Sequence, residues 1–461
     1  MSAVQSIETG RRPNLFHFTR RPQPMVDRAD GIYLWDKSGR RYIDGSSGAV
    51  NVNIGHGNRN VIDAMKRQLD RVSFAYIFQF QNEQAVDLAR ELAERLPNGL
   101  DRIYFVSGGS EAVEACLKLA RQWAVATGQH KRWKIIGRMP SYHGITLGTL
   151  AVTGDDILTK TFDPVGRPMP LVPAPLVHRD QDNLSVEERG LRYANMLEEK
   201  ILEEGPESVL AFIMEPIGGA ATAALVPPDS YFTRIREICD RYGILLIHDE
   251  VMTGIGRTGK FLGGDHWSCR PDIVALSKGL SSGYAPLGAI AASERIVGPV
   301  VEKGGFLHGH TYGGNPVACA AGVAVLGEVD RLGLVENSAI MGELLRGELE
   351  ALSGRFPFVA DVRGKGLFMG AELYADPLAR TPLPQNLNAN LRLIDLAFER
   401  GLIIYSRRVR GGPVSDNFMV CPPLITTREQ IGEIIAVLGD TLEALAAELD
   451  LPVDRSGRMT F

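Results

Sequence analysis

The chain of 461 residues lacks the features that mark membrane, nucleic-acid-binding and disordered proteins. No window of 18 uninterrupted apolar residues occurs, and no apolar stretch follows the basic residues near the start, so we expect neither a membrane span nor a signal peptide. Basic residues number 50 against 55 acidic ones, so nucleic acid is not an expected partner. A hydrophobic share of 44% is enough for a large core, and the length is best explained by two domains.

Cysteine is also scarce, and its five positions are far apart, with no C-x-x-C pair. This spacing argues against a disulfide framework and against a zinc site. We therefore expect reduced thiols in a cytoplasmic protein, and we expect no bound metal. The five positions are Cys116, Cys239, Cys269, Cys319 and Cys421.

Short β-branched runs alternate with longer amphipathic stretches along most of the chain. This alternation is typical of β-α units that form a mainly parallel sheet, and near-continuous apolar runs are typical of strands covered on both faces. We therefore predict an α/β fold. The predicted strands are 102–106, 133–137, 209–214, 244–249 and 272–277, and the predicted helices are 110–126, 191–203 and 231–242.

After about residue 320 the pattern changes, and helices at 316–331, 335–352 and 388–400 with two short strands between them predict a smaller α+β unit. A last helix is expected after Thr426, which has the capping-box spacing to Glu429. We interpret its apolar stripe as a core-facing side. The stripe consists of Ile431, Ile434, Ile435, Leu438, Leu442 and Leu445.

The segment GIGRTGK at 254–260 matches two phosphate-binding patterns, G-x-G-x-x-G and the first seven positions of G-x-x-x-x-G-K-[ST]. Phe261 stands where the second pattern needs a hydroxyl group, and FLGGDHW does not begin a helix whose N-terminus could face a phosphate. We therefore interpret this segment as a glycine-rich loop that binds no phosphate.

A second glycine-rich turn is a better phosphate site. In FVSGGSEAVEACLKLA, residues 105–120, a buried strand leads through Gly108, Gly109 and Ser110 directly into a strong helix. Glycines let the backbone approach an anion, and the free N–H groups of a first helical turn attract its charge. The alternative is an ordinary turn with a serine cap, and this segment alone does not separate the two.

Charged residues end two further predicted strands. The run GILLIHD is followed by Glu250, and because side chains alternate along a strand, Asp249 and Val251 should share one face and Glu250 the other. Lys278 follows the run DIVALS. A desolvated lysine has a lowered pKa and is a nucleophile. The alternative for Asp249 and Glu250 is an acid pair on the surface, and the alternative for Lys278 is a solvated side chain. Together, an anion site, an acid and a lysine at three strand ends are what pyridoxal phosphate requires.

With these residues the sequence resembles the class III aminotransferase family. The resemblance extends from GIYLWD at residue 31 to CPPLITT at residue 421, and it is specific because the motifs occur together and in order. The segments that carry it are SGGSEAVEACLKLA, SYHG (141–144), IMEPIGG (213–219), HDEVMTGIGRTG (248–259), ALSKGL (275–280) and HTYGGNPVACAA (310–321).

The resemblance implies pyridoxal 5'-phosphate as the cofactor and assigns roles to single residues. Lys278 would bind the cofactor aldehyde, and Asp249 would pair with the pyridinium nitrogen. Glu215 would be a buried acid near Asp249 and the ring hydroxyl. The ring itself would lie between Tyr142 and Val251.

The phosphate would be held by Gly109 and Ser110, and Thr311 would reach the phosphate bound by a neighbouring subunit. His143 and Tyr312 are further cofactor-binding candidates. The family therefore also implies a homodimer with shared active sites, alone or paired into a dimer of dimers.

The family further implies a fold type I architecture. Its large domain is built on a mainly parallel seven-stranded sheet, and its small domain is formed by both ends of the chain. We predict that residues 56–324 form the large domain and that residues 1–55 and 325–461 form the small one.

The reaction is harder to specify, because ω-amino-acid and amine transaminases, a decarboxylating branch and an aminomutase branch share these cofactor residues. The decarboxylating branch would have a glutamine near Ala49, and many amine transaminases have a tryptophan near Val50; this chain has neither. We expect ping-pong transfer from an amine or ω-amino acid to a small 2-oxo acid such as pyruvate. The alternatives are the other two branches and a binding module without catalysis.

Four residues are candidates for substrate contacts. Val50 and Tyr76 would line the pocket, and Arg407 or Arg408 could bind a substrate carboxylate bidentately. Tyr76 belongs to SFAYIFQF, residues 73–80, whose alternating aromatic residues could instead be a core strand or helix face. For either arginine the alternative is solvent exposure.

Overall fold

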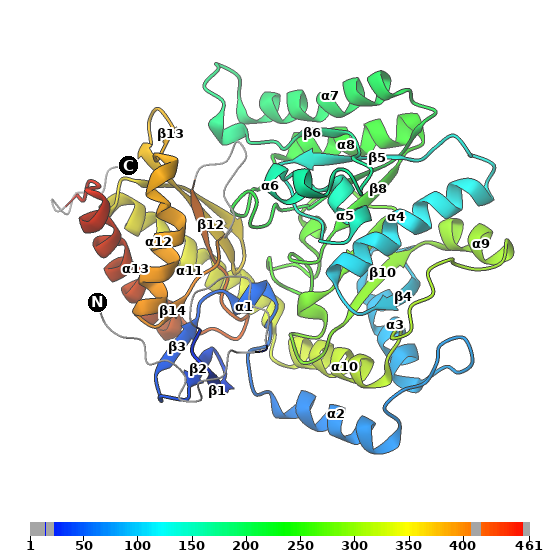
Figure 1. The fold of residues 1–461 in the computed structure, drawn as a ribbon, viewed down its shortest axis with the longest axis horizontal. Helices are drawn as coiled ribbons and strands as arrows, with labels where there is room; N and C mark the ends of the chain where they lie inside the picture. The colour runs from blue at the N-terminus through cyan, green and yellow to red at the C-terminus, as the bar shows by residue number, and fades with distance from the viewer. Residues whose placement is uncertain (1–13, 15–22, 407–415, 455–461) are drawn as a thin grey trace.

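The computed structural model describes residue 14 and residues 23–406 and 416–454. At its centre is a seven-stranded sheet with the order β4-β10-β9-β8-β7-β5-β6 (Figure 1). β10 is antiparallel to both neighbours and the other pairs are parallel, which confirms the predicted α/β fold with a mainly parallel sheet. The strands are β4 (Arg102–Val106), β5 (Lys134–Met139), β6 (Leu171–Pro173), β7 (Val209–Met214), β8 (Leu245–Asp249), β9 (Ile273–Leu276) and β10 (Gly288–Ala292).

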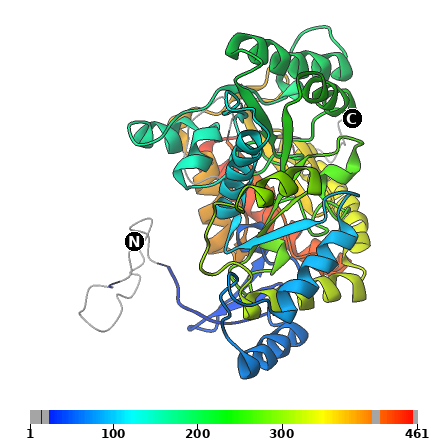
Figure 2. The same ribbon diagram turned by 90° about the vertical axis from the view of Figure 1, so that its right-hand side faces the viewer.

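Helices cover both faces of this sheet, as its apolar strands predict. Ile247 of β8 packs toward the face covered by α4, whereas its neighbour Leu246 packs toward the face covered by α8. Figure 2, turned by 90°, shows that α7 and α2 lie at opposite ends of the molecule. The covering helices are α4 (Gly109–Ala126), α7 (Val186–Glu204), α8 (Asp229–Tyr242) and α9 (Glu294–Glu302).

The two ends of the described chain meet on the other side of the molecule, at the left in Figure 1. β14 (Leu402–Ile403) pairs in parallel with β3 (Arg41–Asp44), so strands far apart in sequence share one sheet. The domain boundaries at residues 55 and 324 stay a prediction. The other elements here are β1 (Val26–Asp30), β2 (Tyr33–Asp36), β11 (Val359–Lys365), β12 (Phe368–Asp376), β13 (Thr381–Pro382), β15 (Asn417–Val420), α11 (Leu334–Arg355), α12 (Ala389–Glu399) and α13 (Arg428–Leu449).

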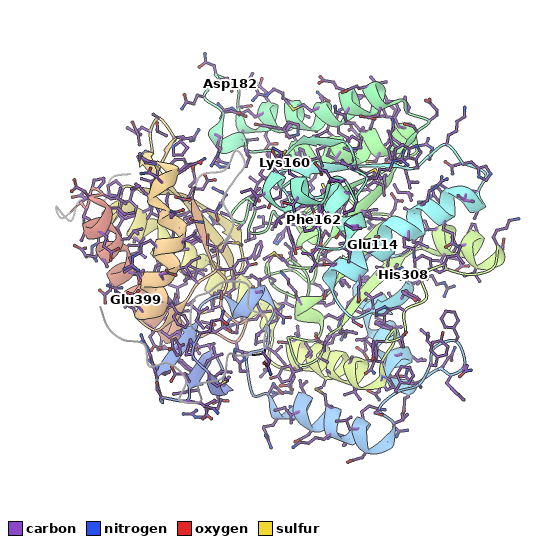
Figure 3. The ribbon with its side chains drawn as sticks, viewed as in Figure 1. Glu114, Lys160, Phe162, Asp182, His308 and Glu399 are labelled. Carbon is purple, nitrogen blue, oxygen red and sulfur yellow. The ribbon has the colours of Figure 1, made fainter. Side chains whose placement is uncertain are left out.

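Shorter elements and three longer helices connect these parts. They are α1 (Ser47–Val50), α2 (Arg59–Arg71), α3 (Glu83–Arg95), α5 (Leu147–Val152), α6 (Asp156–Thr159), α10 (Pro316–Arg331), and the 3₁₀ turns η1 (Lys160–Phe162), η2 (Val177–Arg179), η3 (Gly263–His266), η4 (Lys278–Leu280) and η5 (Gln385–Leu387). No helix in the described ranges is long and apolar enough to cross a membrane. Polar side chains such as Asp182 and Glu399 lie on the outside of the molecule (Figure 3).

The capping prediction for the last helix was wrong by one residue. The capping box joins Thr427 and Gln430, whereas the Thr426 hydroxyl donates to the carbonyl oxygen of Pro423. Both threonines are followed by a suitable polar residue three positions later, so spacing alone could not choose between them. Of the predicted stripe, Ile435 is only partly buried.

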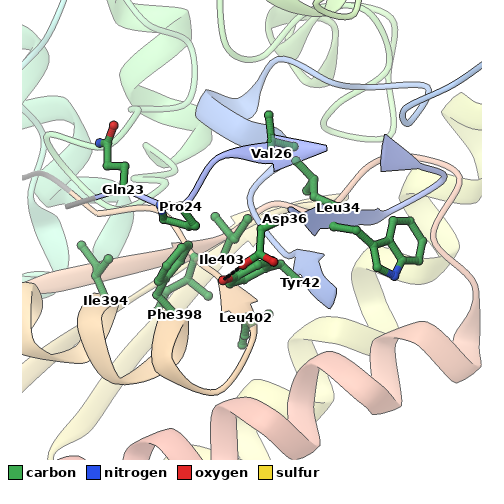
Figure 4. A pocket seen from close by; sticks show the side chains of 12 residues that line it. Gln23, Pro24, Val26, Leu34, Asp36, Tyr42, Ile394, Phe398, Leu402 and Ile403 are labelled. Carbon is green, nitrogen blue, oxygen red and sulfur yellow. Dashed lines mark hydrogen bonds between the residues drawn. The ribbon is translucent and has the colours of Figure 1, made fainter. Parts of the chain in front are cut away.

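An apolar cavity of about 310 Å³ lies between the N-terminal strands and α12 (Figure 4). Its polar groups are satisfied internally: the Tyr42 hydroxyl donates to the Asp36 carboxylate at 2.9 Å, and the Tyr42 ring stacks on Phe398 at 4.9 Å. Of the residues predicted for the active site, none that the structure describes lines this cavity.

Candidate active site

A second cavity, of about 150 Å³, lies at the edge of the central sheet where the parallel strands end. In open α/β sheets this carboxyl edge is where ligands bind. The structure brings together here eight residues that the sequence placed in the site. They are Gly109, Ser110, Tyr142, His143, Glu215, Asp249, Val251 and Lys278.

The N-terminus of α4 borders this cavity. Gly108 is the N-cap and no side chain caps the helix, so the alternative of a serine-capped turn was wrong. Gly109 is required for space, because a Cβ atom there would lie 2.8 Å from Cγ1 of Val251. The Ser110 hydroxyl accepts a hydrogen bond from the N–H of Ile145 at 3.1 Å. An uncapped first turn beside a cavity is a site for an anion such as phosphate.

Asp249 ends β8 with its carboxylate in the cavity and is only 5% exposed. Its Oδ2 atom lies 2.8 Å from Nδ1 of His143, and its Oδ1 accepts from the N–H of Val251 at 3.1 Å. A buried carboxylate held in this way can pair with a ligand cation.

Glu250 lies on the opposite face, as strand alternation predicts. Its carboxylate accepts from the N–H groups of Gly263 at 2.8 Å and Gly264 at 2.6 Å. Burial raises the pKa of Glu250 to about 7, although these hydrogen bonds and one from Thr253 oppose the rise. The two adjacent acids therefore lie in different surroundings, and of the two only Asp249 faces the cavity.

Lys278 begins the turn η4 directly after β9, and protein surrounds its side chain except toward the cavity. Burial lowers the pKa of Lys278 to about 8, while the charges of Asp249 and Glu215 partly oppose the decrease. Its backbone has φ 44°, in the left-handed region that residues other than glycine rarely adopt. An amine with this pKa is partly unprotonated near neutral pH and can react as a nucleophile.

Two polar atoms in the cavity have no partner among the described residues: Oε2 of Glu215 and Nε2 of His143. The other Glu215 oxygen accepts from the N–H of Gly219 at 3.0 Å. Burial raises the pKa of Glu215, and the charges of His143 and Arg138 oppose the rise. Buried polar groups are rarely left unpaired, so these atoms fit a cavity that receives a polar ligand.

Sequence reasoning missed Arg138, which is 1% exposed and lies at the end of β5. Its Nη2 donates to the carbonyl oxygen of Glu215 at 2.5 Å. The signal that revealed Asp249 and Lys278, a charge at the end of an apolar strand, is present in WKIIGR as well. Reading it there would have found this arginine.

Other predicted residues lie outside the cavity. Thr311 and Tyr312 are exposed in the segment before α10, with 61% of Tyr312 accessible. Val50 is buried with φ 57° and packs with Ile217, which does line the cavity. Arg407 and Arg408 lie outside the described residues.

The aromatic segment 73–80 is neither strand nor helix. Phe74 is 42% exposed, Tyr76 39%, Phe78 64% and Phe80 65%, so the interpretation as a core strand or helix face was wrong. The alternating pattern was misleading because nothing in it specified a partner surface. These residues form an exposed aromatic segment close to Tyr312, whose ring lies 6.3 Å from that of Phe74.

The model of the aminotransferase class-III family matches residues 18–442. The chain belongs to this family. It is therefore an enzyme of the fold type I class that uses pyridoxal phosphate. The amine and the acid that face the cavity, the uncapped helix and the unpaired polar atoms fit this cofactor's aldehyde, ring and phosphate.

Curated relatives are similar over nearly their whole length. An uncharacterized aminotransferase, YodT, from Bacillus subtilis is 37% identical, with 92% of this chain and 96% of the relative covered. Diaminobutyrate–2-oxoglutarate transaminase from Halomonas elongata is 35% identical (90% and 89% covered). Putrescine–pyruvate aminotransferase from Pseudomonas aeruginosa is 33% identical (92% and 91% covered).

Solved structures agree with the fold. An (S)-enantioselective omega-transaminase from Thermomicrobium roseum superposes with a TM-score of 0.88 at 36% identity, covering 94% of this chain and 96% of that one. The omega transaminase from Pseudomonas jessenii in complex with PMP gives a TM-score of 0.88 at 32% identity, covering 93% and 94%.

Proposed function

We propose that this aminotransferase moves an amino group from an amine or ω-amino acid to a small 2-oxo acid such as pyruvate, in the two half-reactions of a ping-pong cycle. The observation that carries the proposal is the Lys278 amine, with its pKa lowered to about 8, facing Asp249 in one cavity. The relatives named for putrescine and for diaminobutyrate support this donor class, because both donors have a terminal amino group.

In this proposal each group of cavity residues would bind a different part of the cofactor. Gly109 and Ser110 would hold the phosphate at the N-terminus of α4, and Asp249 would pair with the ring nitrogen. Tyr142 and Val251 line the same cavity and would hold the ring between them. When bound, pyridoxal phosphate supplies an electron-withdrawing ring that stabilises negative charge on the substrate carbon.

The protein moves the proton. Nζ of Lys278 would hold the cofactor aldehyde and, in its free form, would accept a proton from the substrate carbon and donate one in turn. A pKa near 8 suits both steps, because general acid–base catalysis is most efficient near the working pH. The His143 ring, 2.8 Å from Asp249, fixes the orientation of that carboxylate, and Glu215 adds negative charge beside the lysine.

We further propose a homodimer with shared sites, which can itself pair into a dimer of dimers. Contiguous exposed aromatic side chains mark interaction surfaces, and Phe74, Phe78, Phe80 and Tyr312 are such a group. Thr311 is exposed beside Tyr312, and in the assembly it would reach the cofactor phosphate of the partner subunit. A cytoplasmic location stays a prediction from the cysteines, all five of which are free and buried.

For substrate contacts we keep the residues that were proposed from the sequence. Val50 packs against Ile217 of the cavity wall and would border the donor chain. Tyr76 would act from the partner subunit, since in its own subunit it belongs to the exposed segment. Arg407 or Arg408 would bind the acceptor carboxylate.

A half-reaction experiment tests the proposal. Putrescine or an ω-amino acid added without acceptor should convert the visible spectrum of the bound cofactor to that of the pyridoxamine form. Pyruvate should then restore the first spectrum, and 2-oxoglutarate serves as the competing acceptor. Release of carbon dioxide would instead indicate the decarboxylating branch, and isomerisation of one amino acid without an acceptor would indicate an aminomutase.

A further inference from the structure

The segment GIGRTGK, which the proposed cofactor site leaves unexplained, contains a fully buried arginine. Arg257 has no exposed surface, and its guanidinium donates through Nη1 to the carbonyl oxygens of Leu367 at 3.1 Å and Pro422 at 2.6 Å. Through Nη2 it donates to Oγ of Ser47 at 3.1 Å and to Oδ1 of Asn53 at 2.7 Å. One side chain therefore joins the N-terminal segment to the loops before β12 and after β15.

Asn53 extends this network to the reactive lysine. Its Nδ2 donates to the carbonyl oxygen of Ile255 at 3.0 Å, so both ends of the amide are fixed by the glycine-rich segment. The same Nδ2 lies against Gly279, where a Cβ atom would come within 2.3 Å of it. Gly279 directly follows Lys278. Contacts therefore lead from the buried guanidinium to the backbone that carries the amine.

The backbone along this path adopts conformations that need external support. Lys278 has φ 44°, Ile255 58°, Val50 57° and Ser47 50°, all in the left-handed region. Two of these residues are β-branched, for which this region is an outlier, and such strain persists only where surrounding contacts enforce it. Arg257 binds on both sides of Val50, at Ser47 and at Asn53.

We propose that Arg257 is a positioning residue for amino transfer, which fixes through Asn53 the backbone of Lys278 and through Ser47 the segment that carries Val50. Arg257 does not line the cavity, so it acts only through these partners. The proposal rests on Lys278 being the reactive amine, as proposed above. A lysine at this position would carry the same charge but could not donate to acceptors on two sides, because only a guanidinium presents a planar fork of donors.

Arg257→Lys in the holoenzyme tests the proposal. We expect kcat with a reactive amine to fall roughly 10- to 100-fold, since displacements near 1 Å in a catalytic group have effects of this size. The visible circular dichroism of the bound cofactor should weaken, because its attachment point has moved. Lys260→Ala, an exposed residue of the same segment, is the matched control and should stay within about twofold of wild type.

A second variant separates positioning from folding. Asn53→Ala removes the link to Gly279 and leaves Arg257 in place, and it should reproduce the loss of kcat and of circular dichroism. The double variant should lose less than the product of the single losses, because both changes interrupt one path.

Three results would overturn the proposal. One is an Arg257→Lys enzyme whose kcat and cofactor circular dichroism match wild type. Another is a lower melting temperature with unchanged turnover per bound cofactor, which would indicate a purely structural role. If Arg257→Lys does not fold, a fully active Asn53→Ala overturns it. Failure of the proposed function is distinguishable, since the wild type itself would then transfer no amino group from any tested amine.

Discussion

The cavity at the sheet edge and the aromatic segment 73–80 differ in what determines the surroundings of their side chains. Asp249 ends one apolar strand and Lys278 follows another, and both strands are buried within this chain, so packing inside one subunit determines where the two side chains lie. Phe78 and Phe80 are apolar but more than half exposed, so the surface that would cover them is not provided by the described chain. A residue's role can therefore be inferred from sequence where the chain itself supplies its environment.

The strongest test of the cavity is removal of its amine. Lys278→Ala should abolish turnover, with a loss of at least 10⁴-fold, because the nucleophile and the proton carrier are the same atom. Borohydride reduction of the wild type followed by peptide mapping should label Lys278 alone. A label on another lysine would show that the cavity has been misassigned.

The next test uses the two adjacent acids as a matched pair. Asp249→Asn should slow proton removal from the substrate by about 10²- to 10⁴-fold, because a neutral partner no longer keeps the ring nitrogen protonated. Glu250→Gln, one residue away on the opposite face, should stay within about threefold. Single-turnover absorbance measurements give both rates, and equal losses in the two variants would contradict the division of faces.

A substitution in the exposed segment 73–80 should weaken subunit association, and should lower activity only as a consequence. Phe78→Ser should weaken the proposed dimer roughly 30-fold, since truncating an aromatic anchor at an interface costs about 2 kcal/mol. Sedimentation velocity over a range of concentrations measures this, and activity should fall with dilution as Thr311 is withdrawn from the neighbouring site. Leu378→Ser, at a residue that is 95% exposed, is the control. A fully active wild-type monomer would refute the shared site.

The sequence predicted the sheet and the cavity because both depend on local patterns. Unbroken apolar runs located the strands, and the polar residues at their ends located Asp249, Lys278 and the turn before α4. Arg257 was not predicted, because its partners Ser47 and Pro422 are distant in sequence and no local pattern joins them. For segment 73–80 only the alternative of a core strand or helix face was wrong, because alternation fits a strand equally well whether or not a neighbouring strand is present to pair with it. The substrate role of Tyr76 stays a prediction.

The smallest expected effect is on the pH dependence of stability at Glu250, and it distinguishes the two faces of β8 without measuring catalysis. Burial raises the pKa of Glu250 to about 7 from its ordinary value of 4.5, so the folded protein binds this proton more tightly than the unfolded chain does. The stabilisation is therefore present below about pH 4.5 and is lost as the pH rises toward 7. Glu250→Gln cannot ionise, so the melting temperature of the variant relative to wild type should rise between pH 5 and pH 8. Glu207→Gln, at an exposed glutamate, should show no such trend. A difference between Glu250→Gln and wild type that stays constant with pH would show that the Glu250 proton does not contribute to stability in this range.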